Sequence, residues 1–273
     1  MAGNGNIDFF CLECYTDKSE VNTLQTEVIK IDRENMDLDA LKRAGEILKS
    51  GGLVAFPTET VYGLGGDGLH EESSRKIYEA KGRPSDNPLI VHVADMEHLE
   101  KIVKKVPKAA YKLAEAFWPG PMTMILEKND LVPYGTTGGL DTVAIRMPSD
   151  PVALELIRQG GGYIAAPSAN TSGRPSPTTA QHVYEDLQGK IPMILDGGAV
   201  TIGLESTIVD LTEEIPTILR PGFISLDMVQ AVLGEAQIDR GLIANDSNIH
   251  PKAPGMKYRH YAPKADLKIV ESP

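Results

Sequence analysis

The sequence predicts an α/β protein built on a sheet whose strands run in mixed directions. Of its 273 residues, 41% are hydrophobic and 24% are charged, which is typical of a chain that folds around a buried core. Short apolar segments alternate with longer segments of helical periodicity along most of the chain. The alternation is only partial, which favours a mixed sheet over a strictly parallel one.

The first half of the chain reads as alternating strands and helices. Residues 26–31 are typical of an edge strand, and apolar residues then recur at helical spacing from Leu38 until two glycines follow at 51 and 52. A glycine-rich turn is expected at residues 63–68. Asp95 is predicted to cap a helix that carries Met96 and Leu99. The other elements predicted here are strands at 53–56 and 88–93 and helices at 71–80 and 107–117.

Strands are more frequent in the second half. They are predicted at residues 122–126, 143–147, 163–166, 193–195, 206–211 and 217–219. Helices are predicted directly after Asp150, Thr179 and Ser225, whose side chains suit helix N-termini. Residues 245–263 are rich in Asn, Pro, Lys and Tyr and indicate a linker.

The charge of the chain argues against a surface that tracks nucleic acid non-specifically. The net charge is −11, so an anionic ligand needs a local cationic pocket. No apolar run approaches the roughly 20 residues of a membrane span, and the amino terminus lacks a basic region followed by an apolar core. We therefore expect a soluble, cytoplasmic protein that makes no membrane contact.

Cysteine and histidine spacing gives little support for a metal centre. Cys11 and Cys14 form a CxxC motif without a matching second pair, so a zinc site would need two distant histidines. The histidines show neither HxxxH nor HxH spacing: they are His70, His92, His98, His182, His250 and His260. Zinc, redox and metal-hydrolase chemistry at a protein-built site are therefore disfavoured.

Residues 63–68 read GLGGDG and satisfy the GxGxxG pattern of dinucleotide-binding loops. In such loops the first glycine ends a strand and the last opens a helix. Here residues 57–62 separate the predicted strand from the first glycine, and Gly68 precedes the helix by several residues. A nicotinamide-dependent dehydrogenase is therefore an alternative that the spacing disfavours, and NADH titration would reveal it.

The segment KGRPSDNP carries two cations, Lys81 and Arg83, two residues apart on a predicted turn. The chain has no GxxxxGK motif followed by Ser or Thr, so a P-loop is not what would hold phosphates. Lys and Arg on such a turn can hold a triphosphate by charge and bidentate hydrogen bonds. A solvated surface turn is the alternative interpretation of so short a segment.

Small hydroxyl and amide side chains lie beside the ends of predicted strands in three segments. These are residues 57–63 (PTETVYG), 166–170 (APSAN) and 204–207 (LEST). Ligands bind at strand ends in open α/β sheets, although ordinary turns use the same residue types. Arg146 lies within an apolar predicted strand, where an unpaired guanidinium is costly to bury. It therefore needs an anionic partner, from the protein or from a ligand.

Seven segments, in this order and spacing, resemble those of the YrdC-like threonylcarbamoyl-AMP synthases: PTETVYGLGG, KGRPSDNPLIVH, WPGPMTMIL, VAIRMP, PSANTSGRPSPTT, GLESTIVD and ILRPG. The resemblance covers about residues 31–233 and implies a YrdC-like twisted mixed sheet with flanking helices and a large ligand-binding cleft. The longer members also carry a carboxy-terminal domain, which is expected to be largely absent here. The implied division is an irregular segment (1–25), a catalytic domain (26–244), a linker or lid (245–263) and a remnant of the carboxy-terminal domain (264–273).

The resemblance implies an enzyme that joins L-threonine, bicarbonate and ATP into threonylcarbamoyl-AMP and releases pyrophosphate. The product serves the formation of N6-threonylcarbamoyladenosine in tRNA, so contact with the machinery that transfers the group is expected. Mg²⁺ would enter with ATP, held by phosphate oxygens and water rather than by protein side chains. Weak RNA binding is an alternative from the same superfamily, and the net charge weakens it.

The resemblance also assigns the site. Lys81 and Arg83 are the expected catalytic residues, which neutralise the phosphates. The expected ATP-binding residues are Lys81, Arg83, Asn87, Thr142, Asn170, Thr178, Arg220, Tyr258, His260 and Tyr261. The residues expected around threonine are Thr60, His92, Arg146, Ser168 and Ser206, with Arg146 pairing with its carboxylate. The three linker residues, Tyr258, His260 and Tyr261, would close over the nucleotide as a lid.

Overall fold

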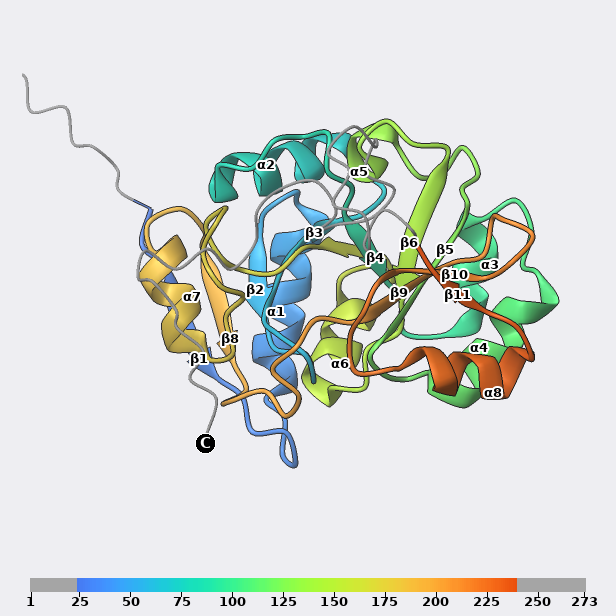
Figure 1. Cartoon of the computed structure of the whole chain (residues 1–273). Helices are drawn as coiled ribbons and strands as arrows, with labels where there is room; N and C mark the ends of the chain where they lie inside the picture. Colours follow the sequence, from blue (N-terminus) through green and yellow to red (C-terminus); the bar gives the residue numbers. More distant parts are fainter. Residues whose placement is uncertain (1–23, 240–273) are drawn as a thin grey trace, which may run out of the picture.

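One mixed sheet runs through residues 24–239, the part of the chain that this computed structural model describes. The strand order is β1-β8-β2-β3-β7-β4-β6-β5-β9-β10-β11, and Figure 1 shows β1 and β8 at one side of the molecule and β10 and β11 at the other. The strands are β1 (Glu27–Lys30), β2 (Val54–Phe56), β3 (Gly63–Asp67), β4 (Ile90–His92), β5 (Met122–Glu127), β6 (Thr142–Arg146), β7 (Ile164–Ala166), β8 (Met193–Asp196), β9 (Thr207–Asp210), β10 (Thr217–Arg220) and β11 (Gln237–Ile238).

Parallel and antiparallel pairs are equally frequent among these strands. β8 pairs in parallel with β1 and β2, β4 with β6, β5 with β9 and β10 with β11. The other five neighbouring pairs are antiparallel. The predicted α/β class with a mixed sheet is therefore confirmed.

Helices flank the sheet close to where the sequence predicts them. They are α1 (Leu38–Lys49), α2 (Glu71–Lys81), α3 (Met96–Ile102), α4 (Lys108–Phe117), α5 (Tyr134–Thr137), α6 (Pro151–Gln159), α7 (Ala180–Leu187) and α8 (Leu226–Leu233). Four predicted caps are confirmed, because the side chains of Asp95, Asp150, Thr179 and Ser225 each accept a hydrogen bond from the first turn.

The prediction of a glycine-rich turn at residues 63–68 is wrong, because the segment forms strand β3 between β2 and β7. Close packing explains the glycines. A Cβ atom on Gly65 would lie 2.8 Å from Cγ2 of Ile164 and 3.0 Å from the ring of Phe56. The segment is therefore neither a turn nor a dinucleotide-binding loop. Two elements were also missed, α5 and β11, which have four and two residues and are too short to show a periodicity.

Alternate residues along the strands pack on opposite faces of the sheet. Val54 and Phe56 of β2 join a core cluster with α1 and α6, whereas Ala55 joins the cluster with α2 and α7. In the half that contains β4, β5, β6 and β9, helices α3, α4 and α8 cover one face. The opposite face carries a smaller apolar cluster that includes Ile90, and Ile90 also lines a pocket.

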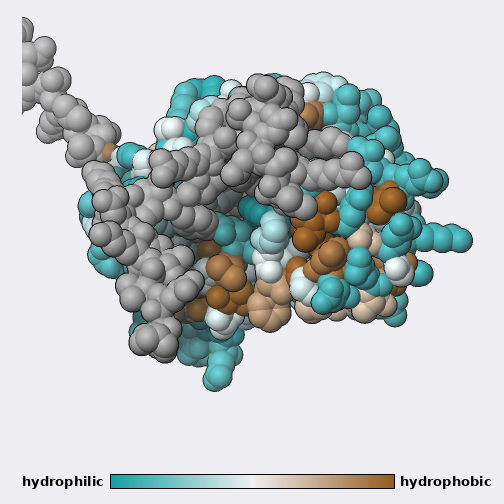
Figure 2. Space-filling model, in the orientation of Figure 1, coloured by the Kyte–Doolittle hydropathy of each residue, from teal (hydrophilic) through white to brown (hydrophobic). Residues whose placement is uncertain are grey.

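Hydrophilic and hydrophobic residues are interspersed on the face that Figure 2 shows. Leu204 and Phe223 are among the large hydrophobic residues that are more than half exposed. None of the helices between residues 24 and 239 has the length and apolar character needed to cross a membrane. The predictions for Cys11 and Cys14, for the linker at 245–263 and for residues 264–273 fall outside the described residues.

Candidate active site

Several strand ends meet at one edge of the sheet and surround a cavity of about 520 Å³. β4 and β6 are parallel, with His92 opposite Arg146, and the antiparallel strand β5 places Thr123 opposite Arg146 as well. β9 starts beside the start of β5, which brings Ser206 to the same edge, and Arg220 ends the neighbouring strand β10. Strand register alone therefore assembles side chains that are up to about 130 residues apart in sequence.

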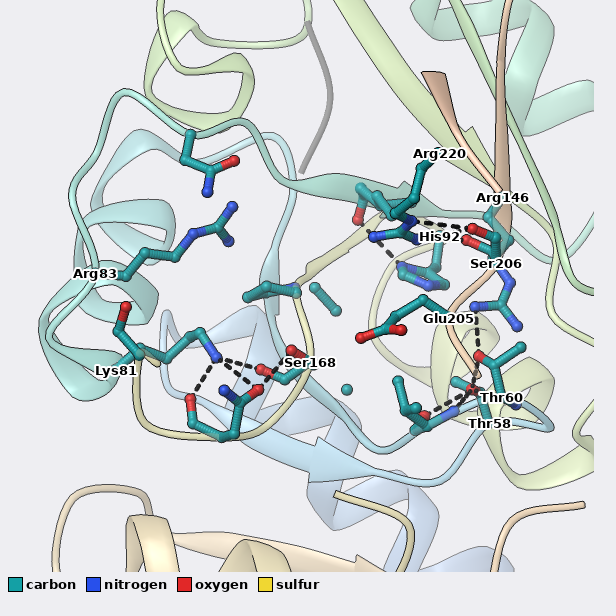
Figure 3. A pocket seen from close by; sticks show the side chains of 18 of the residues that line it. Thr58, Thr60, Lys81, Arg83, His92, Arg146, Ser168, Glu205, Ser206 and Arg220 are labelled. Carbon is teal, nitrogen blue, oxygen red and sulfur yellow. Dashed lines mark hydrogen bonds between the residues drawn. The ribbon is translucent and has the colours of Figure 1, made fainter. Parts of the chain in front are cut away.

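Ten of the residues expected in the site line this cavity: Thr60, Lys81, Arg83, Asn87, His92, Arg146, Ser168, Asn170, Ser206 and Arg220. Figure 3 shows Lys81 and Arg83 on one side of the pocket and Arg146 and Thr60 on the other. The pocket therefore has two ends: a cationic end with Lys81 and Arg83, and a hydroxyl-rich end where Thr60 and Ser206 lie beside Arg146 and Arg220.

Five expected residues are not among those that line the cavity. Thr142 begins β6, where it pairs with Glu127 of β5. The hydroxyl of Thr178 lies 3.4 Å from Nδ1 of His182, just before α7. The remaining three are Tyr258, His260 and Tyr261, which fall outside the described residues, so their lid remains a prediction.

Lys81 is buried, contrary to the expectation of a turn that carries both cations. It is the last residue of α2, and the left-handed Gly82 (φ 60°) ends the helix after it. Its Nζ donates to the carbonyl oxygens of Ser168 and Asn170 and lies 3.4 Å from Oδ1 of Asn170. Burial, and then the nearby Arg83, hold the pKa of Lys81 well below its usual value. Lys81 thus ties the end of α2 to the segment that follows β7.

Arg83 lines the same end of the pocket, two residues after this buried lysine. Its Nη2 donates to the carbonyl oxygen of Pro88 at 3.2 Å, and its guanidinium lies 5.8 Å from the ring centroid of Tyr78. Asn87 lines the same end and is 1% exposed, and its Oδ1 has no hydrogen-bond partner among residues 24–239. A buried acceptor in this position is suited to a ligand that donates a hydrogen bond.

Arg146 has the anionic partner that the sequence requires, and the partner is a protein group. Its Nη2 donates to Oε1 of Glu59 at 2.7 Å, and both side chains are more than nine-tenths buried. Nη1 donates to Oγ1 of Thr60 at 2.9 Å, and Nε donates to the carbonyl oxygen of Gly120 at 3.3 Å. The guanidinium is therefore held in one orientation at the hydroxyl-rich end of the pocket.

His92 is buried next to Arg146 and is neutral. Burial, and then the charge of Arg146, lower its pKa to about 3. Its Nδ1 lies 3.1 Å from the carbonyl oxygen of Ile90. Because a carbonyl only accepts, the ring donates this hydrogen bond from Nδ1.

Ser206 and Arg220 hold each other at the start of β9. Nη2 of Arg220 donates to the carbonyl oxygen and to Oγ of Ser206, at 2.9 and 3.0 Å. Oγ of Ser206 also lies 2.7 Å from Oγ1 of Thr123. Glu205 lines the pocket beside them and accepts a hydrogen bond from Ser176 at 2.5 Å. Across residues 24–239, no cluster of three or more His, Cys, Asp or Glu forms a candidate metal centre.

Glu59, Thr58 and Glu205 were not among the residues expected in the site. All three lie in the segments PTETVYG and LEST, in which only Thr60 and Ser206 were expected to bind a ligand. A signal for Glu59 was present, since Arg146 requires an anion and Glu59 adjoins Thr60. The sequence could not show which acidic residue would meet Arg146.

Two family models match the chain. The model of the Sua5–YciO–YrdC family, described as telomere recombination, matches residues 46–222. A model described as the C-terminal domain of threonylcarbamoyl-AMP synthase matches residues 224–273, a longer stretch than the remnant expected at 264–273.

Relatives and solved structures agree with these matches. A threonylcarbamoyl-AMP synthase of Pyrococcus abyssi is 52% identical over 241 residues, which cover 88% of this chain and 71% of that protein. One of Bacillus subtilis is 53% identical over 232 residues, covering 85% of this chain and 66% of that protein. The crystal structure of P. abyssi Sua5 complexed with L-threonine superposes with a TM-score of 0.85 at 52% identity, covering 88% of this chain and 70% of that one.

Proposed function

Because the chain belongs to the Sua5–YciO–YrdC family, we propose that it is a threonylcarbamoyl-AMP synthase, which joins L-threonine, bicarbonate and ATP and releases pyrophosphate. One observation carries the proposal from the structure. Four basic side chains, Lys81, Arg83, Arg146 and Arg220, line a single cavity together with one acidic side chain, Glu205, in a chain whose net charge is −11. A pocket of this sign in an acidic protein is suited to an anionic ligand such as a triphosphate.

The reaction needs no nucleophile from the protein. The amine of threonine adds to bicarbonate and gives a carbamate and water. A carbamate oxygen then attacks the α-phosphorus of ATP and forms a new bond to it. The bond between the α-phosphorus and the oxygen that bridges to the β-phosphorus breaks, and pyrophosphate leaves. The protein contributes by holding the reactants in line and by stabilising the charge that develops on the phosphates.

The two ends of the pocket suit the two larger substrates. Arg83 and the acceptor of Asn87 lie at the cationic end, which suits the nucleotide. Thr60, His92 and Ser206 lie at the other end, where hydroxyl groups and a neutral imidazole suit a small polar amino acid. Arg146 retains one N–H on each of Nη1 and Nη2 beyond its bonds to Thr60 and Glu59, and these suit the threonine carboxylate.

We propose that Mg²⁺ accompanies the triphosphate. Phosphate oxygens and water would hold the ion, and the carboxylate of Glu205 lines the same pocket. When bound, the ion neutralises charge on the phosphates. Arg83 and Arg220 do the same from the protein.

The product would pass to a partner that transfers the threonylcarbamoyl group to tRNA. Direct binding of RNA by this chain is the second, less favoured proposal, since the net charge of −11 gives it no support. Filter binding of tRNA over a salt series separates the two. An RNA-binding protein loses affinity steeply as salt rises, whereas a synthase of small molecules need show no affinity.

Pyrophosphate release tests the proposed function, with threonine, bicarbonate and ATP each omitted in turn. Release should require all three, and mass spectrometry should detect threonylcarbamoyl-AMP in the complete mixture. Equal release without threonine would indicate a simple nucleotidase and would refute the proposal. EDTA with and without added Mg²⁺ tests the metal separately.

A further inference from the structure

Glu59 is a buried carboxylate beside the pocket, and it does not line the cavity itself. Its Oε1 accepts from Nη2 of Arg146 at 2.7 Å, and its Oε2 accepts from the backbone N–H of Ser149 at 3.1 Å. Both carboxylate oxygens are therefore engaged, and the side chain is 9% exposed. A carboxylate fixed at both oxygens can in turn fix the guanidinium that it binds.

The fixed guanidinium acts on Thr60. Nη1 of Arg146 donates to Oγ1 of Thr60 at 2.9 Å, and this oxygen also lies 2.9 Å from Oγ1 of Thr58. Oγ1 of Thr58 donates its own hydrogen to the carbonyl oxygen of Val61 at 2.7 Å and accepts from the backbone N–H groups of Thr60 and Val61, at 3.2 and 3.3 Å. The hydroxyl of Thr60, which lines the pocket, is therefore held in place between Arg146 and Thr58.

The backbone of Glu59 and Thr60 holds the loop between β8 and β9, which lies at this end of the pocket. The carbonyl oxygen of Glu59 accepts from the N–H of Ile202 at 2.9 Å and from the hydroxyl of Thr201 at 3.3 Å. The carbonyl oxygen of Thr60 accepts from the N–H of Gly203 at 3.1 Å. The loop between β8 and β9 is thereby fixed just before Glu205, which lines the pocket. The side chain of Glu59 thus holds Arg146, and its backbone holds the loop between β8 and β9, both at the hydroxyl-rich end of the pocket.

We infer that Glu59 is a positioning residue for L-threonine, which sets the hydroxyl-rich end of the pocket through Arg146 and Thr60 without contacting the substrate. The inference rests on the proposed function. It predicts that neutralising Glu59 loosens the hold on threonine and leaves the hold on ATP, whose cationic end it does not contact. A carboxylate that only stabilised the fold would affect both substrates equally.

Asp150 provides a matched control in the same chain. Like Glu59, it is a buried carboxylate that accepts from an arginine, Nε of Arg33 at 3.0 Å, and from a backbone N–H, that of Val152 at 2.9 Å. It caps α6 and does not line the pocket. Asp150→Asn therefore removes a comparable buried charge without touching Arg146 or Thr60.

The experiment compares Glu59→Gln with Asp150→Asn in the full chain, using calorimetric titration of L-threonine together with the KM values for threonine and ATP. Glu59→Gln should weaken threonine binding and raise the KM for threonine by roughly tenfold to a hundredfold. The reason is that a group misplaced by about 1 Å in an active site can lower the rate of the reaction by up to about 10²-fold. The KM for ATP should change less than about twofold. Asp150→Asn should lower the melting temperature and leave both KM values unchanged.

Three results separate the failures. If the wild-type chain does not bind threonine, the proposed function fails. If the wild type binds and Glu59→Gln binds equally well, or raises both KM values in parallel, Glu59 has no positioning role. Should Glu59→Gln not fold, Glu59→Asp keeps the charge on a shorter side chain, and it must show the same selective rise in the threonine KM for the inference to stand.

Discussion

Acidification should destabilise this fold through His92. The imidazole is buried, and burial together with the charge of Arg146 lowers its pKa to about 3. In the unfolded chain the same group titrates near its ordinary value of about 6.5. Between these two values the unfolded chain is protonated at this residue and the folded chain is not, so a fall in pH favours unfolding.

The sign and size of the effect follow from this difference. Above about pH 6.5 both states are neutral at His92, and the residue adds no pH dependence. Below it, the free energy of unfolding falls by about 1.4 kcal/mol per pH unit until the folded pKa is reached. From about pH 7.5 to about pH 5 the loss is about 2 kcal/mol. Because pH 5 lies above the folded pKa, this figure depends almost entirely on the unfolded value.

Urea unfolding at the two pH values measures this loss. His92→Asn removes the titrating group and keeps an amide donor near the position of Nδ1, so its unfolding free energy should fall by about 2 kcal/mol less than that of the wild type. His182→Asn removes an exposed histidine instead and should retain the full His92 contribution. Equal losses in the wild type and in His92→Asn would refute the assignment of a neutral, buried imidazole.

Three further predictions test the site and the sheet. Lys81→Met should lower both the melting temperature and the rate of pyrophosphate release, because each buried carbonyl left unpaired costs about 1–3 kcal/mol. Arg83→Ala should lower the rate by roughly 10²-fold with little effect on the melting temperature. A similar fall in melting temperature in the two variants would contradict this difference. Gly222→Ala should cost about 1–3 kcal/mol in urea unfolding and raise the threonine KM, because its Cβ would lie 2.5 Å from the backbone oxygen of Glu205; unchanged kinetics would show that the segment shifts freely. Gly65→Val should prevent β3 from pairing, which circular dichroism and loss of soluble protein would report, and a soluble variant of native stability would oppose the packing argument.

Local patterns in the sequence were sufficient for most elements of the fold. Each helix capped by Asp95, Asp150, Thr179 or Ser225 begins where expected, because a cap depends only on residues within one turn of itself. Most strands were also found, since apolar β-branched segments bounded by glycine or proline carry their own signal. The motifs alone also selected ten residues that line one cavity in the structure.

The sequence misjudged Gly63–Asp67 because its local signal is that of a turn. What makes the segment a strand is its close packing against Phe56 and Ile164, which only glycine permits. Phe56 lies on the neighbouring strand β2, and Ile164 is about 100 residues away in the sequence, so neither contact can be seen in the local pattern. The same holds for the strand order, in which β8 lies between β1 and β2. Long-range pairing of this kind leaves no periodic trace in the segments that pair.

The sequence by itself determined that Arg146 must meet an anion, and its motifs predicted that Lys81 and Arg83 face one ligand. Only the tertiary structure decided that the anion is Glu59 and that Lys81 is buried against the carbonyls of Ser168 and Asn170. The physical reason is that the residue type fixes how much a buried charge costs, whereas its partner depends on which distant segments the strand register brings within about 3 Å.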